Sequence, residues 1–182
     1  LKYPFLFSQL NNTYTMIDLN SKESLWKKNI QCDQTIIFSS AKSTGCLRKN
    51  VLSVYDTITG EKLKDVKSSK FKDSIYISST NSYAFFKSKK NNIFKVNLNS
   101  YKLTNTKYSL NNFEFVLRQK ELIQVEDNEV QCVDLISEKL KWKSKFETSI
   151  LDIIHNQNYL LLKLPSKNMT IIDNYNGESV IM

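Results

Sequence analysis

Few residues of this chain have the types and spacing that catalysis needs. His155 is the single histidine among 182 residues, and no HExxH, paired-histidine or GxSxG pattern accompanies it. A lone histidine beside apolar neighbours is more often a structural residue than a base or a metal ligand. Three glycines are too few for a glycine-rich phosphate loop. The sequence therefore predicts no catalytic residue, no metal ligand and no cofactor, and we expect a protein that is not an enzyme.

The cysteines and carboxylates support the same prediction. Cys32, Cys46 and Cys132 lie far apart with no CxxC pair, which excludes a zinc-ribbon pattern. Cys132 lies in the apolar run VQCV and is predicted to be a small buried hydrophobe, whereas the sequence leaves a bridge between Cys32 and Cys46 open. The acidic residues fall mostly in expected turns, so a two-carboxylate hydrolase would need distant turns to meet.

One short pattern occurs five times and organises the chain. It reads DLISEKLKW from Asp134 to Trp142, and copies at intervals of roughly 40 residues begin at Asp18, Asp56, Asn97 and Asp173. Each copy follows an alternating or apolar run and precedes another, which is typical of the turn of a β-hairpin. The Asp or Asn at the end of the first strand can accept hydrogen bonds from backbone N–H groups two residues further on.

Glycine and tryptophan have expected structural roles in this pattern. Gly60 and Gly177 suit a turn position where the backbone adopts a positive φ. Trp26 and Trp142 come eight residues after their Asp, so we expect them on the next strand, filling the space between neighbouring repeats. The pattern therefore predicts a structural device that needs no ligand.

Four short strands per repeat, separated by polar turns, are typical of a β-propeller blade. We predict an all-β chain of four-stranded antiparallel blades, because no segment of 10 or more residues shows the period of a crossover helix. The first repeat lacks its opening strand, so about four to five blades are present. We expect an arc of a larger ring; the alternative is a small closed propeller in which residues 4–9 complete the last blade. The predicted blades cover residues 1–30, 31–70, 71–109, 110–146 and 147–182.

Two segments give more detailed expectations. KLKWKSKF, residues 139–146, alternates strictly, which places Leu140, Trp142, Ser144 and Phe146 on one face and four lysines on the other, as suits an outer edge strand. Residues 41–45 are predicted to form a loop because of their Ser and Gly content.

The net charge of +8 does not indicate nucleic-acid binding. Lysine is scattered over every repeat rather than gathered on one element with aromatic residues, so nucleic acid is an unlikely partner. No apolar run reaches the roughly 18 residues of a membrane-spanning helix, and we expect membrane contact only through segments outside this chain. Two N-x-S/T sequons, at Asn11 and Asn168, fall in expected hairpin turns and are candidate glycosylation sites.

The repeat resembles the quinoprotein-type, or PQQ-like, β-propeller repeat, whose blade signature is close to A-x-D-x-x-T-G-K-x-x-W. The likeness is best at DTITGEKLK from Asp56 and at the copies that begin at Asp18 and Asp134, and it recurs over nearly the whole chain. It departs where Lys22, Tyr101 and Glu138 replace Gly, where Asn97 replaces Asp, and where Lys64, Asn105 and Ile181 replace Trp.

The resemblance implies several functions, because this repeat occurs in enzymes, assembly factors and receptors. The adjacent cysteine pair and carboxylate-rich metal cluster of the quinone-dependent dehydrogenases are missing, so a dehydrogenase-type fragment is the less favoured alternative. A protein-interaction scaffold with other protein subunits as partners fits better. The resemblance favours the lumenal propeller of ER membrane protein complex subunit 1, and hence the ER lumen over the cytoplasm. Outer-membrane assembly factors and unfolded-protein-sensing lumenal domains are further alternatives.

Overall fold

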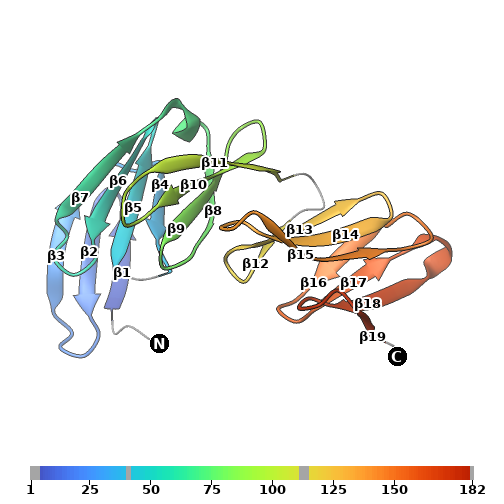
Figure 1. The fold of residues 1–182 in the computed structure, drawn as a ribbon. Coiled ribbons are helices and arrows are strands. Elements are labelled where there is room, and N and C mark those ends of the chain that lie inside the picture. Colours follow the sequence, from blue (N-terminus) through green and yellow to red (C-terminus); the bar gives the residue numbers. More distant parts are fainter. Residues whose placement is uncertain (1–4, 40–41, 111–114, 181–182) are drawn as a thin grey trace. The chain divides into compact units, whose positions relative to one another are not determined.

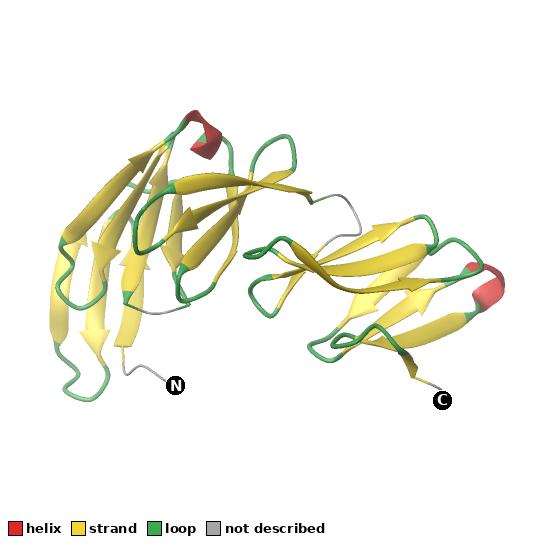
Figure 2. Ribbon diagram, in the orientation of Figure 1, coloured by secondary structure: helices red, strands yellow, loops and turns green. Residues whose placement is uncertain are grey.

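The structure is a computed structural model that describes residues 5–39, 42–110 and 115–180. The described chain is built from antiparallel strands, with two short 3-10 helices, η1 (Ser69–Phe71) and η2 (Pro165–Lys167) (Figures 1 and 2). The predicted all-β class is confirmed. The chain divides into two compact units, Leu1–Asn105 and Thr106–Met182, and the division falls inside β11.

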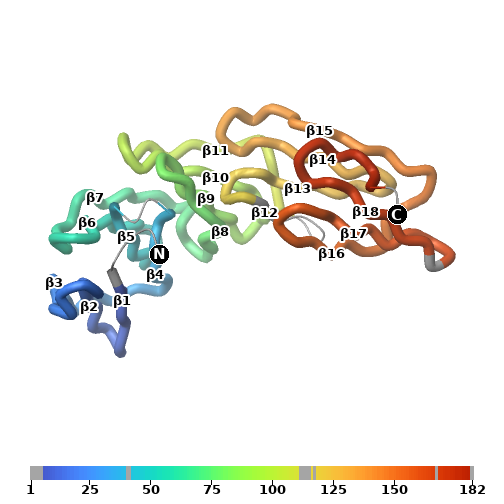
Figure 3. Tube along the Cα trace, turned by 90° about the horizontal axis from the view of Figure 1, so that it is seen from below, coloured from blue at the N-terminus to red at the C-terminus, as the bar shows by residue number. Residues whose placement is uncertain are grey.

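The first unit holds three sheets, each formed by consecutive strands. Sheet 1 contains β1 (Phe5–Leu10), β2 (Thr13–Asp18) and β3 (Ser24–Asn29); sheet 2 contains β4 (Gln34–Ile37), β5 (Ser43–Arg48), β6 (Val51–Asp56) and β7 (Lys62–Lys67); sheet 3 contains β8 (Ile75–Ser79), β9 (Tyr83–Lys87), β10 (Asn92–Asn97) and β11 (Leu103–Ser109). Within this unit, each sheet lies beside the one that precedes it in the chain (Figures 1 and 3).

The second unit holds two sheets of the same kind. Sheet 4 contains β12 (Phe115–Leu117), β13 (Glu121–Glu126), β14 (Glu129–Asp134) and β15 (Lys139–Lys145); sheet 5 contains β16 (Asp152–His155), β17 (Tyr159–Lys163), β18 (Met169–Asp173) and β19 (Ser179–Val180). Strand order follows chain order in every sheet. In the part of the chain that the structure describes, sheet 1 has three strands and each of the other sheets has four.

The cores lie between the faces of consecutive sheets. Sheets 2 and 3 bury branched aliphatic and aromatic side chains against each other, among them Leu52, Val54, Phe86 and Phe94. Sheets 4 and 5 bury a second cluster, which includes Cys132, Trp142, Leu160, Leu162 and Ile172. Alternate residues of a strand point to opposite faces, so the central strands, which are covered on both sides, are rich in Ile, Val, Leu and Phe.

The strict alternation predicted for residues 139–146 is wrong at Leu140. A register shift between Cys132 and Val133 pairs Val133 with Leu140 and Cys132 with Trp142, leaving Lys141 as the extra residue. Such a bulge turns the strand, so Leu140 is 53% exposed while Trp142 is buried. The same shift follows Met16 in sheet 1 and Val54 in sheet 2.

The loop predicted at residues 41–45 is also wrong for its second half. Ser43 begins β5, and Gly45 lies inside this strand opposite Ile36. A Cβ at Gly45 would lie 2.8 Å from the Phe38 ring, so the glycine provides room for that ring rather than a turn. Residues 40 and 41 lie outside the described chain.

Candidate functional site

The five repeated turns share one hydrogen-bond geometry. In each, the side-chain oxygen of the Asp or Asn accepts a hydrogen bond from the backbone N–H two residues further on. These bonds run to Asp18 (2.8 Å), Asp56 (2.8 Å), Asn97 (2.9 Å), Asp134 (3.0 Å) and Asp173 (2.6 Å). Four carboxylates and the Asn97 amide therefore hold these turns through local hydrogen bonds.

The fifth residue of every turn has a positive φ. Its N–H donates to the carbonyl of the Asp or Asn over 2.7–2.9 Å in all five copies. The residues are Lys22 (φ 62°), Gly60 (68°), Tyr101 (57°), Glu138 (58°) and Gly177 (75°). A left-handed residue that is not glycine costs about 1–2 kcal/mol, so three of the turns form despite this strain.

The two tryptophans explain why only two of these positions are glycine. Trp26, on β3, donates its indole N–H to the Thr57 carbonyl over 2.8 Å, and its ring lies against Gly60 of the next sheet. Trp142, on β15, donates to the Asn174 carbonyl over 2.9 Å in the same way. Each ring therefore joins one sheet to the turn of the next.

A charged cluster that the sequence analysis missed lies between sheets 4 and 5. Glu121 is 4% exposed and accepts from Arg118 Nε and Lys141 Nζ, each at 2.5 Å. The Arg118 guanidinium also donates to the Asn174 carbonyl over 2.7 Å and lies 4.1 Å from the centroid of the Tyr175 ring. Glu121 and Lys141 are 20 positions apart, and Asn174 and Tyr175 lie further along the chain, so spacing gives little signal. The Glu121 carboxylate is paired with both cations, so we assign the cluster a structural role.

Next to this cluster, Asp134 has a second partner. Its carboxylate lies 2.9 Å from Lys120 Nζ. Burial raises the pKa of Asp134, but the Ser137 N–H and the Lys120 ammonium stabilise the anion more, so the pKa falls below its usual value. This turn is therefore held by a carboxylate that stays ionised.

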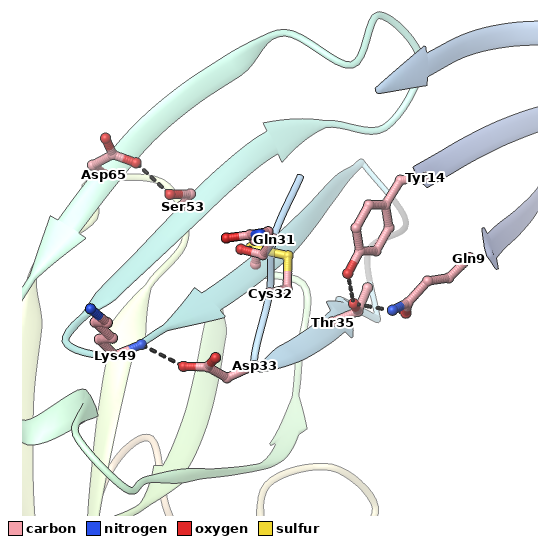
Figure 4. Close-up of a disulfide and its surroundings, with 10 residues drawn as sticks. Gln9, Tyr14, Gln31, Cys32, Asp33, Thr35, Lys49, Ser53 and Asp65 are labelled. Carbon is pink, nitrogen blue, oxygen red and sulfur yellow. Dashed lines mark hydrogen bonds between the residues drawn. A yellow bond between two sulfur atoms is a disulfide. The ribbon is translucent and has the colours of Figure 1, made fainter. Parts of the chain in front are cut away.

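A cleft of about 590 Å³ lies beside a disulfide in the first unit. Cys32 and Cys46 form the disulfide, which answers the question left open by the sequence. Arg48, Lys49 and Lys62 line the cleft. The backbone N–H of Lys49 donates to the Asp33 carboxylate over 2.6 Å, and Figure 4 draws this hydrogen bond. The cleft is open and its lysine and arginine side chains are exposed.

Near the cleft, Ser53 donates to the Asp65 carboxylate over 2.6 Å (Figure 4). This hydrogen bond is the main reason that the pKa of Asp65 is lowered, with Lys62 adding to it. The contact lies across β6 and β7 and stabilises their pairing.

One face of sheet 5 is apolar and exposed. Its exposed side chains are Ile154 (64%), Met169 (63%), Tyr159 (42%) and Val180 (39%). Of these four, Ile154, Tyr159 and Val180 line a hollow of about 400 Å³ on this face. Leu161, Ile171, His155 and Asn156 complete its lining. On the opposite face, Leu160, Leu162 and Ile172 are fully buried against sheet 4.

The remaining predicted positions lie as follows. His155 ends β16 at the rim of this hollow and is exposed. Cys132 is buried and has a free thiol. Asn11 and Asn168 lie in the β1–β2 and β17–β18 connections, and both are exposed. Among the described residues, no group of three or more His, Cys, Asp and Glu side chains is placed to hold a metal ion, and no helix is long and apolar enough to cross a membrane.

The comparisons with known proteins support the fold. A family model described as "Domain of unknown function (DUF5046)" matches residues 8–112. No curated protein matches the sequence. Among solved structures, Kluyveromyces lactis Hsv2 superposes with a TM-score of 0.64 at 8% identity, covering 98% of this chain and 59% of that chain. The β-propeller domain of Myceliophteria thermophila Cps50 (Swd1) gives 0.51 at 11% identity, covering 95% and 64%.

These likenesses show a β-propeller fold and confirm the predicted fold class. This chain spans about three fifths of the Hsv2 chains that it matches. The finer resemblance to PQQ-like repeats, and to the lumenal propeller of an ER membrane complex, stays a prediction.

Proposed function

Because this chain belongs to the DUF5046 family, whose description assigns no activity, we propose from its own surfaces that it is a non-enzymatic scaffold that binds other proteins. The observation that carries this proposal is the exposed apolar face of sheet 5. Four large apolar side chains on one sheet face are 39–64% exposed, and three of them, Ile154, Tyr159 and Val180, line a hollow. A contiguous exposed apolar patch is typical of a protein-binding surface.

The repeat indicates which chemistry this face accepts. With Asp173 aligned to Asp134, the face residues Met169 and Ile171 correspond to Val130 and Cys132. Val130 and Cys132 are fully buried against the aliphatic side chains of the next sheet. The partner that fits is therefore a protein that presents a sheet face of branched aliphatic residues, as sheet 5 itself presents Leu160 and Leu162 to sheet 4.

The finer proposal places this scaffold in the ER lumen, as a subunit of a membrane protein complex. The Cys32–Cys46 disulfide supports an oxidising compartment, because disulfides persist there and are rare in the cytosol. The exposed Asn11 and Asn168 would be accessible to glycosylation in the same compartment. Endoglycosidase treatment of the native protein tests this, with Asn11→Gln and Asn168→Gln as controls. An unshifted, unglycosylated protein with free Cys32 and Cys46 would contradict the lumenal location but not the scaffold role.

Quantitative affinity purification of the tagged full-length protein tests the scaffold role. Ile154→Lys places a charge in the apolar face, and Leu140→Lys makes the same change at a residue that is similarly exposed on β15 of the same unit. Both side chains are exposed, so the thermal stability of both variants should match the wild type. We expect a defined set of proteins to be lost with Ile154→Lys and retained with Leu140→Lys. Equal recovery with both variants would overturn the proposal.

A further inference from the structure

A second surface, in the first unit, is the cleft of about 590 Å³ beside the disulfide. This volume lies within the range of about 300–1,000 Å³ that is typical of ligand sites. One wall is formed by β5, β6 and β7, and the other by the end of β3 and its connection to β4. The lining residues that the structure describes lie between Asn29 and Lys62, away from both ends of the chain.

The cleft carries a positive charge. Arg48, Lys49 and Lys62 line it, and no Asp or Glu is found among its described lining residues. Within the described part of the chain, neither the Arg48 guanidinium nor the Lys49 ammonium forms an ion pair with a carboxylate. Both residues are exposed. The cleft therefore attracts a ligand that carries negative charge.

The register of sheet 2 keeps the cations apart. Arg48 pairs with Val51 and Lys62 pairs with Tyr55, so the two cationic residues lie four positions apart along β6. Four residues of a strand span about 13 Å. Two separate anionic groups therefore fit this cleft better than one compact anion such as phosphate.

A carboxylate borders the middle of the cleft. Asp65 pairs with Ser53, midway along the same stretch of β6, and accepts a hydrogen bond from its hydroxyl over 2.6 Å (Figure 4). This bond, with the nearby Lys62 ammonium, lowers the pKa of Asp65, so the carboxylate is ionised and repels a third acidic group. Lys62 lies 3.2 Å from Asp65, and its ammonium has further donors for a ligand. The middle of a bound segment should therefore be uncharged, in contact with Val51 and Cys46.

The wall opposite β5 is fixed in place. Cys32 follows the segment Asn29–Gln31 that lines the cleft, and its disulfide bond to Cys46 ties that segment to β5. The Ile30 N–H donates to the Asn12 carbonyl over 2.8 Å, which holds the same segment to sheet 1. A ligand therefore meets a cleft that is already formed and does not need to order this wall first.

We propose that this cleft binds an extended acidic segment of a partner protein, with two carboxylates four residues apart and an uncharged residue midway between them. In an extended segment, alternate residues project to the same side, so all three side chains enter the cleft. One carboxylate pairs with Arg48 and Lys49, the other pairs with Lys62, and the middle side chain lies over Val51. This inference is independent of the sheet 5 face, because the two surfaces lie in different units.

Two peptides of identical composition test the proposal on the whole 182-residue chain. The peptide SETVTES has glutamates at its second and sixth positions and a valine midway. The peptide STEETVS has adjacent glutamates, which project to opposite sides of an extended chain. Both carry an amidated C-terminus and an uncharged dye. Fluorescence anisotropy should show that SETVTES binds at least about fivefold more tightly, because STEETVS leaves one end of the cleft without an anion.

A pair of variants checks the site of binding. Arg48→Glu reverses a charge in the cleft, and Lys64→Glu makes the same reversal on β7 at an exposed residue that does not line it. Both side chains are exposed, so both variants should keep the thermal midpoint of the wild type. The affinity for SETVTES should fall at least about tenfold in Arg48→Glu and no more than about twofold in Lys64→Glu.

Several outcomes would overturn the proposal. These are no binding of SETVTES, equal affinities for the two peptides, and equal losses in the two variants. Displacement of SETVTES by an equal concentration of inorganic phosphate would also overturn it, because the cleft would then be a site for a compact anion. The comparison of the two peptides uses the wild-type chain and does not depend on either variant. None of these outcomes bears on the partner that the sheet 5 face is proposed to bind.

Discussion

The Trp142 ring lies directly against the backbone of Gly177. A Cβ placed on this glycine would lie 2.5 Å from Trp142 Cε3, and Trp26 and Gly60 show the same relationship at 2.7 Å. Turns that follow a repeat without tryptophan carry a side chain at this position. The glycine is therefore required for two reasons: its backbone adopts a positive φ, and the tryptophan ring of the preceding repeat leaves no room for a Cβ. We call this contact between the ring and the glycine the joint between two sheets.

Gly177→Ala should destabilise the protein by about 2–4 kcal/mol, because it adds both left-handed strain and an overlap with the indole. The matched control is Glu138→Ala at the equivalent turn position. Glu138 already has a Cβ and a φ of 58°. The Glu138→Ala variant should therefore change the free energy of unfolding by no more than about 0.5 kcal/mol. Urea unfolding of both variants measures the difference. Equal midpoints would contradict a stabilising contact between Trp142 and Gly177.

Glu121→Gln should destabilise the second unit by about 2–4 kcal/mol. The change removes the buried anion that Arg118 and Lys141 share and leaves two cations without compensation. Glu129→Gln is the control, because Glu129 pairs over 2.6 Å with Lys143, which lies on β15 as Lys141 does, but Glu129 is more exposed than Glu121. It should cost no more than about 1 kcal/mol. A ranking in the opposite order, in thermal or urea unfolding, would show that the Glu121 cluster does not stabilise the fold.

Reduction of the disulfide should lower stability by about 3 kcal/mol, since Cys32 and Cys46 are 14 residues apart. Urea midpoints with and without dithiothreitol measure this effect. The Cys32→Ala/Cys46→Ala variant should unfold at the midpoint of the reduced wild type and should not respond to the reductant. The urea midpoint of Cys132→Ala should shift with dithiothreitol as much as that of the wild type. Loss of this shift in Cys132→Ala would contradict the assignment of the disulfide to Cys32 and Cys46.

Cys132 should make stability fall at alkaline pH. Burial, aided by the nearby Glu121 carboxylate, raises the pKa of this thiol from 9.0 to about 12. The unfolded chain therefore loses the proton first, and the free energy of unfolding falls as pH rises above 9. By pH 10.5 the wild type should lose about 2 kcal/mol relative to Cys132→Ala. Unfolding series from pH 8 to 10.5 test this, and parallel curves for the two proteins would refute it.

The sequence was sufficient for the features that lie within one repeat. The turn carboxylates, the strands on either side and the glycines at positive φ are local, so Asp134 and Gly177 could be placed from spacing. The bulge at Lys141 could not, because an alternating pattern looks the same with or without one extra residue. Leu140 was therefore assigned to the wrong face.

Contacts between residues that are distant in the chain could not be predicted from the sequence either. Three cysteines allow several pairings, so the bond between Cys32 and Cys46 stayed open. Glu121 begins an apolar strand, and nothing near it indicates that Arg118 and Lys141 meet its carboxylate. Gly45 resembled a loop residue because its neighbours are small, whereas its function is to leave room for Phe38, seven residues earlier.

Hydrogen–deuterium exchange of the complex that co-purifies with the native protein tests the central claim most directly. In comparison with the isolated chain, the account predicts added protection in β16, β17 and β18, around Ile154 and Met169, with no change along β15. Protection confined to other strands, with sheet 5 exchanging equally in both samples, would contradict a protein-binding role for this face.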